Sequence, residues 1–306
     1  MKGVLFLFVD GVGLGVEDPA VNPLVAARTP SLDGLLGRRL AGITERVRWD
    51  GALLVPLDAT LGVAGLPQSA TGQTALLTGI NASQAVGRHV TAYPTTQLKA
   101  LLTDHNLFAQ VQRAGGTVAL ANAYTPEYFA AVDAGRLRHA SITFAALSAG
   151  VRLRGLEDLR AGQAVFHDLT NARPRAWGHE VPSITPREAG RHLADVARGQ
   201  HLTVFEFFLT DLAAHRRIEL TPVAAVEMLD GLVGGVLEAS DPAETLLLLA
   251  SDHGNLEDGR EKRHTRNPVP ALLVGAGRDA VGAHLSAITD VAPAVVAWLA
   301  GEMRHG

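Results

Sequence analysis

The segment Val4–Gly13 reads VLFLFVDGVG, in which six consecutive apolar residues are followed directly by an acidic residue and a glycine. An uninterrupted apolar run of this length is typical of a parallel strand that helices cover on both faces. We therefore expect a buried strand over Val4–Val9, with Asp10 at its carboxyl end.

Two later segments repeat this pattern. Leu202–Leu209 is mostly apolar and leads to Asp211, and Thr245–Ala250 is apolar and leads to Asp252. In open α/β sheets, ligands bind just beyond the carboxyl ends of the strands. We expect the acidic residues that follow the three strands, Asp10 included, to converge at that edge.

Segments with helical patterns alternate with these strands. Such alternation predicts an α/β fold, in which helices cover both faces of a mainly parallel central sheet. The segment 125–182 interrupts the alternation with arginines and short turns, and we interpret it as a small inserted cap on a core of residues 1–124 and 183–306. The predicted helices are Leu98–Ala114, Pro186–Arg198, Pro222–Glu238 and Asp290–Leu299.

The composition excludes several classes of protein. With 306 residues, 47% of them hydrophobic, the chain can bury a substantial core. Its net charge is −4 and its basic residues are scattered, which argues against binding to nucleic acid. Cysteine is absent, which excludes disulfides and thiolate chemistry.

The N-terminal apolar run is far shorter than the ~20 residues that span a bilayer. We expect a cytoplasmic protein without a membrane partner, and leave its oligomeric state open.

The glycines after the first strand do not predict a dinucleotide site. Gly11–Gly15 has the spacing GxGxG rather than GxGxxG, and Asp10 stands where phosphates would approach. The sequence also lacks a GxxxxGK[ST] loop.

Asp211 and His215 have the spacing of metal ligands. Residues four apart share one face of a helix, so the two side chains can bind one cation together. The alternative is an ordinary acidic residue at a helix N-terminus with a histidine on the surface.

Asp252 and His253 leave a predicted strand side by side and can point into one cleft, with Gly254 allowing a tight turn. His264 follows eleven residues after His253. Alone it would be a structural or solvated histidine, whereas together with the other clusters it is a candidate third imidazole ligand.

Ser69 lies where a helix is predicted to begin, in the segment QSATGQTALLTG. Free backbone N–H groups and the helix dipole can stabilise a phosphate at that position. The alternative role is that of an N-cap, which serine commonly fills. Because a free serine hydroxyl is a weak nucleophile, catalysis by Ser69 requires activation, for example by a metal ion.

These clusters together resemble the alkaline phosphatase superfamily of metalloenzymes, and within it the branch of cofactor-independent phosphoglycerate mutase and phosphopentomutase. The matching segments occur in the family's order and cover about 1–80 and 200–300. They are Asp10–Gly13, Asn22-Pro23, Ala27–Asp33, Ser69–Gly72, Asp211 with His215, Asp252–Asn255, His264-Thr265 and Ile288–Pro293.

The resemblance implies an alkaline-phosphatase-like fold and two sites for divalent cations, Mn²⁺ or Zn²⁺. It also implies that Ser69 is the catalytic nucleophile and forms a phosphoserine intermediate. The first implied site consists of Asp10, Ser69, Asp252 and His253, and the second of Asp211, His215 and His264.

The sequence departs from the family in two respects. Gln73 replaces the histidine that usually follows the glycine after the nucleophile, and the mutase of phosphoglycerate carries a much larger insertion after that nucleophile. The sequence argues against the sulfatase branch, because Ser69 is not followed by the proline and arginine of the sulfatase motif C/S-x-P-x-R.

Arg88, His89 and Arg266 are weaker candidates for binding a substrate phosphate or carboxylate. Arg173 and Arg175 in the predicted cap have a similar standing. For each, the alternative is a solvated basic residue.

The sequence therefore predicts a metal-dependent phosphatase that hydrolyses a small phosphorylated substrate through Ser69. A lid must cover a mutase substrate and exclude water, and the predicted cap is small for that purpose. Two alternatives remain, namely an intramolecular phosphomutase and a catalytically inert protein that binds small molecules on the same scaffold.

Overall fold

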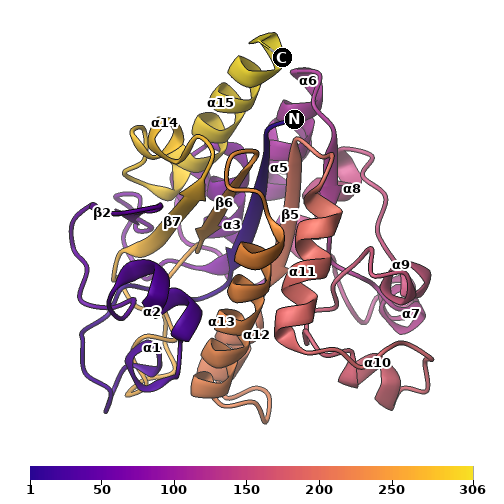
Figure 1. Ribbon diagram of the computed structural model, residues 1–306, viewed down its shortest axis with the longest axis horizontal. Helices are drawn as coiled ribbons and strands as arrows, with labels where there is room; N and C mark the ends of the chain where they lie inside the picture. The colour runs from indigo at the N-terminus through magenta and orange to yellow at the C-terminus, as the bar shows by residue number, and fades with distance from the viewer. Residues whose placement is uncertain (306) are drawn as a thin grey trace.

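The structure is a computed structural model that describes residues 1–305. Its centre is a seven-stranded sheet with the order β2-β3-β7-β6-β1-β5-β4 (Figure 1). The strands are β1 (Gly3–Val9), β2 (Val47–Trp49), β3 (Ala52–Leu57), β4 (Val118–Leu120), β5 (Leu202–Phe207), β6 (Thr245–Ala250) and β7 (Val269–Gly275).

The middle of the sheet is parallel, as the sequence predicts. β1 pairs in parallel with β5 on one side and with β6 on the other, and Phe8 of β1 lies opposite both Glu206 and Ala250. The carboxyl ends of the three strands are therefore level with one another. β5 ends at Phe207 rather than at the predicted Leu209, because Leu209 begins the next helix.

The other edge of the sheet is antiparallel. β7 pairs antiparallel with β6, and the hairpin of β2 and β3 pairs with β7. Pro56 in β3 lies opposite Pro270 in β7. Proline cannot donate a hydrogen bond to a ladder and argues against a strand, which explains why sequence patterns miss β3.

Two hydrophobic cores lie on opposite faces of the sheet. Val4, Phe6 and Phe8 of β1 belong to one core, and Leu5, Leu7 and Val9 belong to the other. Side chains of a strand point alternately to its two faces. Because helices cover both faces, every side chain of β1 is buried, which is why the run is continuously apolar.

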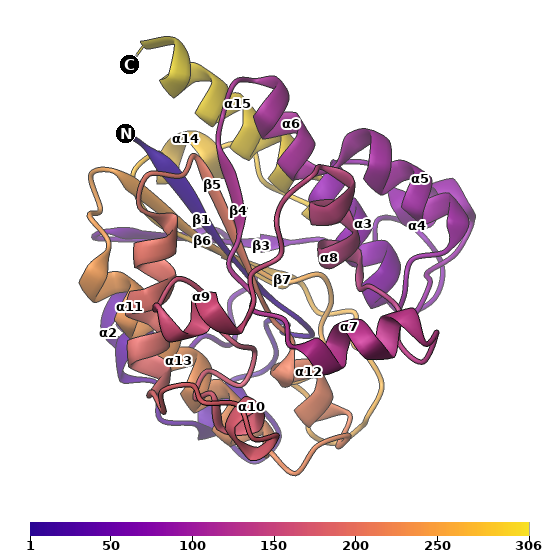
Figure 2. The same cartoon turned by 90° about the vertical axis from the view of Figure 1, so that its right-hand side faces the viewer.

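The helices form a layer on each face (Figure 2). The first core contains buried residues of α3, α5, α6, α8 and α15, and the second contains buried residues of α2, α11 and α13. The helices of the first layer are α3 (Ser69–Thr78), α5 (Thr96–His105), α6 (Leu107–Arg113), α8 (Ser141–Ser148) and α15 (Val291–His305). Those of the second are α2 (Pro30–Leu36), α11 (Pro186–Ala197) and α13 (Pro222–Ala239). The remaining ones are α1 (Pro23–Ala26), α4 (Ala82–Val86), α7 (Pro126–Asp133), α9 (Leu156–Arg160), α10 (Ala172–Ala176), α12 (Leu209–Ala214), α14 (Arg278–Gly282) and the 3₁₀ helix η1 (Ile288–Asp290).

The prediction of one continuous helix over Leu98–Ala114 is wrong, because two helices, α5 and α6, occupy this region. Asn106 separates them: its side chain accepts a hydrogen bond from the backbone N–H of Ala109 at 2.9 Å and so caps α6. The C-terminal helix α15 begins at Val291, one residue after the predicted start, and continues beyond Leu299 to His305.

The segment 125–182 contains α7, α8, α9 and α10. α8 is part of the layer on the first face, where it buries Ile142, Ala145 and Ala146. A separate small cluster forms around Phe166, with Leu159 from α9. The role of this segment as a cap stays a prediction. Among residues 1–305, no helix is both long and apolar enough to cross a membrane.

Candidate metal centre

The loops that follow β1 and β6 bring two of the predicted ligands, Asp10 and Asp252, close to His253. Its Nε2 atom lies 3.2 Å from Oδ1 of Asp10 and 3.6 Å from Oδ2 of Asp252. The hydroxyl oxygen of Ser69, which approaches from α3, lies 2.9 Å from the same Nε2 atom. These four residues form the first cluster.

The second cluster forms around α12, immediately after β5. Oδ1 of Asp211 lies 3.4 Å from Nε2 of His215 and 3.6 Å from Nε2 of His264. The two Nε2 atoms are 3.0 Å apart. Asp211 and His215 thus share one face of a short helix, as their spacing predicts.

The two clusters adjoin each other. Asp10, Asp211 and His253 have possible ligand atoms that all lie within 4.8 Å of one another, and the same holds for Asp211, His215 and His264. The rings of His253 and His264 stack with centroids 3.8 Å apart. Asp211 therefore lies between the clusters, and all seven predicted ligands gather at the carboxyl ends of the parallel strands.

Ser69 is the first residue of α3, and Gln68 occupies the N-cap position. The serine hydroxyl is directed to His253 instead of capping the helix. Gly72 permits this approach, because a Cβ atom there would lie 2.8 Å from the backbone oxygen of Asp252. Thr71 faces a different environment: its hydroxyl donates to the carbonyl of Gln68 at 3.2 Å and accepts from the N–H of Val90 at 3.1 Å.

The first cluster holds more buried carboxylate oxygens than the imidazole of His253 can pair with. Both carboxylate oxygens of Asp252, and Oδ1 of Asp10, are buried and accept no hydrogen bond within the described chain. Burial, and then the neighbouring charge of Asp211, raises the pKa of Asp10. Burial, and then the charge of Asp10, raises the pKa of Asp252 well above its usual value. A buried carboxylate needs a compensating charge, and these oxygens fit a cation.

The pKa values of His253 and His264 shift in opposite directions. Burial lowers the pKa of His253, but the charges of Asp252 and Asp10 outweigh burial and raise this pKa to about 10. Burial, and then the charge of His253, lowers the pKa of His264 to about 3. Burial also raises the pKa of Asp211, but the hydrogen bond from His215 and the charge of His253 hold it below its usual value.

Neighbouring groups orient the ligands of the second cluster. Nδ1 of His264 donates to the carbonyl oxygen of Pro67 at 2.7 Å, which leaves Nε2 with a lone pair facing Asp211. Nδ2 of Asn255 donates to Oδ1 of Asp211 at 2.8 Å. Metal-binding histidines commonly donate their other ring nitrogen to a carbonyl or carboxylate in this way.

Gly254 has a different role from the predicted one. Its backbone does not adopt the left-handed conformation, so the turn itself does not require glycine. A Cβ atom at Gly254 would instead lie 2.2 Å from Oγ1 of Thr265 and 2.3 Å from Oε1 of Glu257. Space for these two side chains is the reason for the glycine.

Two acidic residues at this edge are missed by the sequence patterns. Glu257 is buried and accepts hydrogen bonds from the loops that follow β1 and β6. Glu206 is buried in β5, and burial, followed by the charge of Asp10, raises its pKa to about 8. An acidic residue inside the otherwise apolar run of β5 was the available signal.

The weaker candidates for substrate binding are Arg88, His89 and Arg266. The segment from Arg88 to Val90 runs beside the start of α3, where the carbonyl of Val90 accepts from the N–H of Ala70 at 3.1 Å. Nδ1 of His89 lies 3.0 Å from Oγ of Ser83, and its pKa is lowered by burial and by the charge of nearby Arg266. Arg88 and Arg266 are exposed.

The arginines of the predicted cap lie in α10. The guanidinium of Arg173 stands 5.2 Å from the centre of the Trp177 ring. Neither Arg173 nor Arg175 forms a hydrogen bond with any of the seven predicted ligands.

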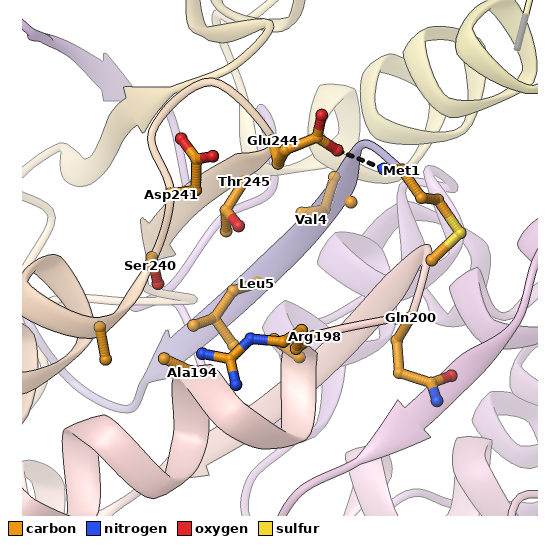
Figure 3. Close-up of a pocket in the computed structure, with 14 residues that line it drawn as sticks. Met1, Val4, Leu5, Ala194, Arg198, Gln200, Ser240, Asp241, Glu244 and Thr245 are labelled. Atoms are coloured by element: carbon orange, nitrogen blue, oxygen red, sulfur yellow. Dashed lines mark hydrogen bonds and ion pairs between the residues drawn. The ribbon is translucent and has the colours of Figure 1, made fainter.

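A pocket of about 360 Å³ lies at the opposite edge of the sheet, beside the amino ends of β1 and β6 (Figure 3). Two of its charged groups, the amino group of Met1 and the guanidinium of Arg198, are paired with acidic side chains. The amino group of Met1 pairs with Glu244, and Arg198 pairs with Asp195 at 2.9 Å. This pocket is not part of the ligand cluster.

Part of the chain is similar to a known protein family. Residues 187–300 match the model of the Metalloenzyme superfamily. Two similar proteins are 2,3-bisphosphoglycerate-independent phosphoglycerate mutases: that of Syntrophotalea carbinolica is 35% identical over 123 residues, and that of Moorella thermoacetica is 31% identical over 123 residues. The match covers 38% of this chain but only 23% and 24% of these mutases, so it spans about a quarter of their length.

Solved structures resemble the whole chain. The PH0037 protein from Pyrococcus horikoshii aligns with a TM-score of 0.59 and 14% identity, over 98% of this chain and 97% of its own. An alkaline phosphatase from the Antarctic bacterium TAB5 aligns with a TM-score of 0.53 and 11% identity, over 98% of both chains. At these identities the likeness concerns the fold, and it confirms the predicted alkaline-phosphatase-like α/β fold.

Proposed function

We propose that this protein, whose residues 187–300 match the model of the Metalloenzyme superfamily and whose fold resembles that of an alkaline phosphatase, transfers phosphoryl groups through Ser69 with the help of two divalent cations. The favoured reaction is hydrolysis of a small phosphate ester. The observation that carries this proposal is the set of buried oxygens of Asp10 and Asp252 that accept no hydrogen bond from the described residues and lie around His253, with the Ser69 hydroxyl 2.9 Å from the imidazole.

The seven residues divide into two ligand sets. Their nitrogen and oxygen donors suit Mn²⁺ or Zn²⁺. When bound, such cations would lower the pKa of the serine hydroxyl and offset the charge of the phosphoryl oxygens. The first set is Asp10, Ser69, Asp252 and His253, and the second is Asp211, His215 and His264.

Ser69 has the position that a nucleophile requires. The Ser69 hydroxyl would release its proton to solvent, and its oxygen would form a bond to phosphorus while the bond from phosphorus to the ester oxygen breaks. The departing alkoxide would take up a proton from solvent. The backbone N–H groups that follow Ser69 are not free to bind the phosphoryl group, because those of Ala70 and Thr71 donate to the carbonyl oxygen of Val90 and that of Gly72 donates to the carbonyl oxygen of Gln68. The positive end of the α3 dipole would still favour a phosphoryl group on Ser69. Attack of water on the phosphoserine would then release phosphate and restore the hydroxyl.

The alternative is an intramolecular phosphomutase, in which a second hydroxyl of the substrate takes the phosphoryl group back from Ser69. The similarity to phosphoglycerate mutases supports this reading. Hydrolysis is favoured because α8 is built into the helix layer of the core. Only the rest of the segment 125–182 would then be free to close over a substrate and exclude water.

The remaining assignments are proposals of the same kind. Arg88, His89 and Arg266 would bind the phosphate or another anionic group of the substrate at the rim beside α3. The partner would be a small phosphorylated molecule in the cytoplasm. An inert binding protein is disfavoured, because all seven ligand positions are filled.

A substrate screen tests the proposal. The purified protein is incubated with phosphate monoesters, diesters, sugar phosphates and nucleotides in the presence of Mn²⁺ or Zn²⁺, and the products are analysed for free phosphate and for isomers. Release of phosphate that Ser69→Ala abolishes supports the hydrolase. Isomerised substrate without phosphate supports the mutase. Binding of substrate without either product would indicate the inert protein.

A further inference from the structure

Glu257 lies in the segment between β6 and β7, and its side chain is 1% exposed. One carboxylate oxygen, Oε2, accepts from the backbone N–H of Gly13 at 2.9 Å and from that of Asn255 at 2.8 Å. The other, Oε1, accepts from the hydroxyl of Thr265 and from Nδ2 of Asn267, the latter at 3.0 Å. Four donors thus surround one buried carboxylate.

These donors come from the same segments as the metal ligands. Gly13 is three residues after Asp10, and Thr265 directly follows His264. Asn255 is two residues after His253, and its side chain donates to Oδ1 of Asp211 at 2.8 Å. Through its donors, Glu257 connects the loop after β1, the loop after β6 and the segment that carries His264, and through Asn255 it connects them to α12.

Three glycines provide the space for this side chain. A Cβ atom at Gly13 would lie 2.3 Å from Oε1 of Glu257, and one at Gly254 would lie equally close to the same oxygen. A Cβ atom at Gly15 would lie 2.7 Å from its Cγ atom. The backbone of both loops therefore packs directly on Glu257.

We propose that Glu257 is a positioning residue that fixes the geometry of the two metal sites relative to each other. This inference rests on the proposed function, because it takes the two clusters as metal sites. Glu257 contributes no atom to either ligand set. It acts by holding the ligand-bearing loops together, so its loss should weaken both sites at once, whereas loss of one ligand should act mainly on its own site.

The test compares Glu257→Leu with Glu257→Gln in Co²⁺ titrations, followed by the visible absorption of the bound ion, and in Zn²⁺ calorimetry. Leucine leaves four donors without an acceptor. We expect both sites to lose affinity about 10–100-fold, the range found for residues that support metal ligands, together with a changed Co²⁺ spectrum. Glutamine should restore most of the affinity. Its oxygen can face the two backbone N–H groups, while Thr265 and Asn267 can turn to accept from its amide.

Asp230→Asn is the matched control. Asp230 is also buried, but it accepts from the backbone N–H groups of Ser31 and Leu32, at the start of α2. Its replacement should lower stability and leave metal affinity and the Co²⁺ spectrum unchanged. A folded Glu257→Leu that binds both ions like the unmodified protein, or an effect on stability alone, would overturn the proposal.

Two further outcomes are decisive. If Glu257→Leu does not fold, Thr265→Val and Asn267→Ala each remove one donor, and unchanged metal affinity in both would overturn the positioning role. If the unmodified protein binds no metal, the proposed function itself fails, and this inference fails with it. Metal binding by the unmodified protein therefore separates the two failures.

Discussion

The hydroxyl oxygen of Ser69 lies 2.9 Å from Nε2 of His253, although 184 positions separate the two residues in the chain. Their contact joins the start of α3 to the loop after β6. Because Gln68 occupies the N-cap position, the hydroxyl is free to face the carboxylates of Asp10 and Asp252. This contact leaves the Ser69 hydroxyl in the position that the proposed nucleophile requires.

Replacement of Asp252 by asparagine should have opposite effects on metal binding and on the metal-free protein. The unmodified protein should bind two divalent cations per chain, and Asp252→Asn should bind one of them much more weakly. Neither oxygen of Asp252 accepts a hydrogen bond from the described residues, and burial and the charge of Asp10 raise its pKa, so removal of this carboxyl should raise the free energy of unfolding of the metal-free protein by about 1–3 kcal/mol. Elemental analysis after metal loading and urea titration measure the two effects. Full occupancy in the variant would show that Asp252 is not a ligand.

Glu206 should make the stability of the metal-free protein depend on pH. Its pKa is raised from 4.5 to about 8 by burial and by the charge of Asp10. As pH rises, the unfolded chain loses this proton near pH 4.5, whereas the folded chain keeps it up to about pH 8. The free energy of unfolding therefore falls between these pH values, by at most about 1.4 kcal/mol per pH unit. Glu206→Gln should remove this part of the dependence. Urea titrations at several pH values measure it, and identical slopes for the two proteins would contradict the assignment.

Replacement of Arg173 or Arg175 by alanine should change substrate binding and not metal content. Both residues lie in α10, which supplies no proposed ligand. We expect a higher KM or an altered substrate preference, with two cations still bound. For Arg173, loss of its contact with Trp177 should also cost about 0.5–1 kcal/mol of stability. Arg198→Ala, at the opposite edge of the sheet, is the control that should change neither substrate binding nor metal content. Loss of metal from the α10 variants would show that metal binding by the core depends on the predicted cap.

Much of the fold was predictable from local patterns, because burial on both faces leaves a continuous apolar run, as in β1. The parallel order of the strands then places Asp10, Asp211 and Asp252 at one edge. The hairpin of β2 and β3 was missed, because β2 is short and β3 contains Pro56. The break at Asn106 carried a visible signal, since asparagine commonly caps helices.

The clustering of the seven ligand candidates was predictable only from the joint occurrence of several motifs. Glu257 was not, because its role depends on contacts with Gly13, which lies 244 positions away. No local pattern encodes such a contact. The raised pKa of Glu206 was not predictable either, because it depends on burial and on the charge of Asp10, which is distant in the sequence.

The most direct test of the account is to locate the phosphoryl group on the enzyme. The metal-loaded protein is mixed with a substrate from the screen, quenched in acid, digested and analysed by phosphopeptide mapping. Thr71→Ala is the control, because Thr71 is a hydroxyl residue in the same helical turn whose oxygen is held by Gln68 and Val90. We predict phosphate on Ser69 in the unmodified protein and in Thr71→Ala. Ser69→Ala should remain folded, carry no phosphate and lose turnover by orders of magnitude. Phosphate on Thr71, or full turnover by Ser69→Ala, would contradict the account.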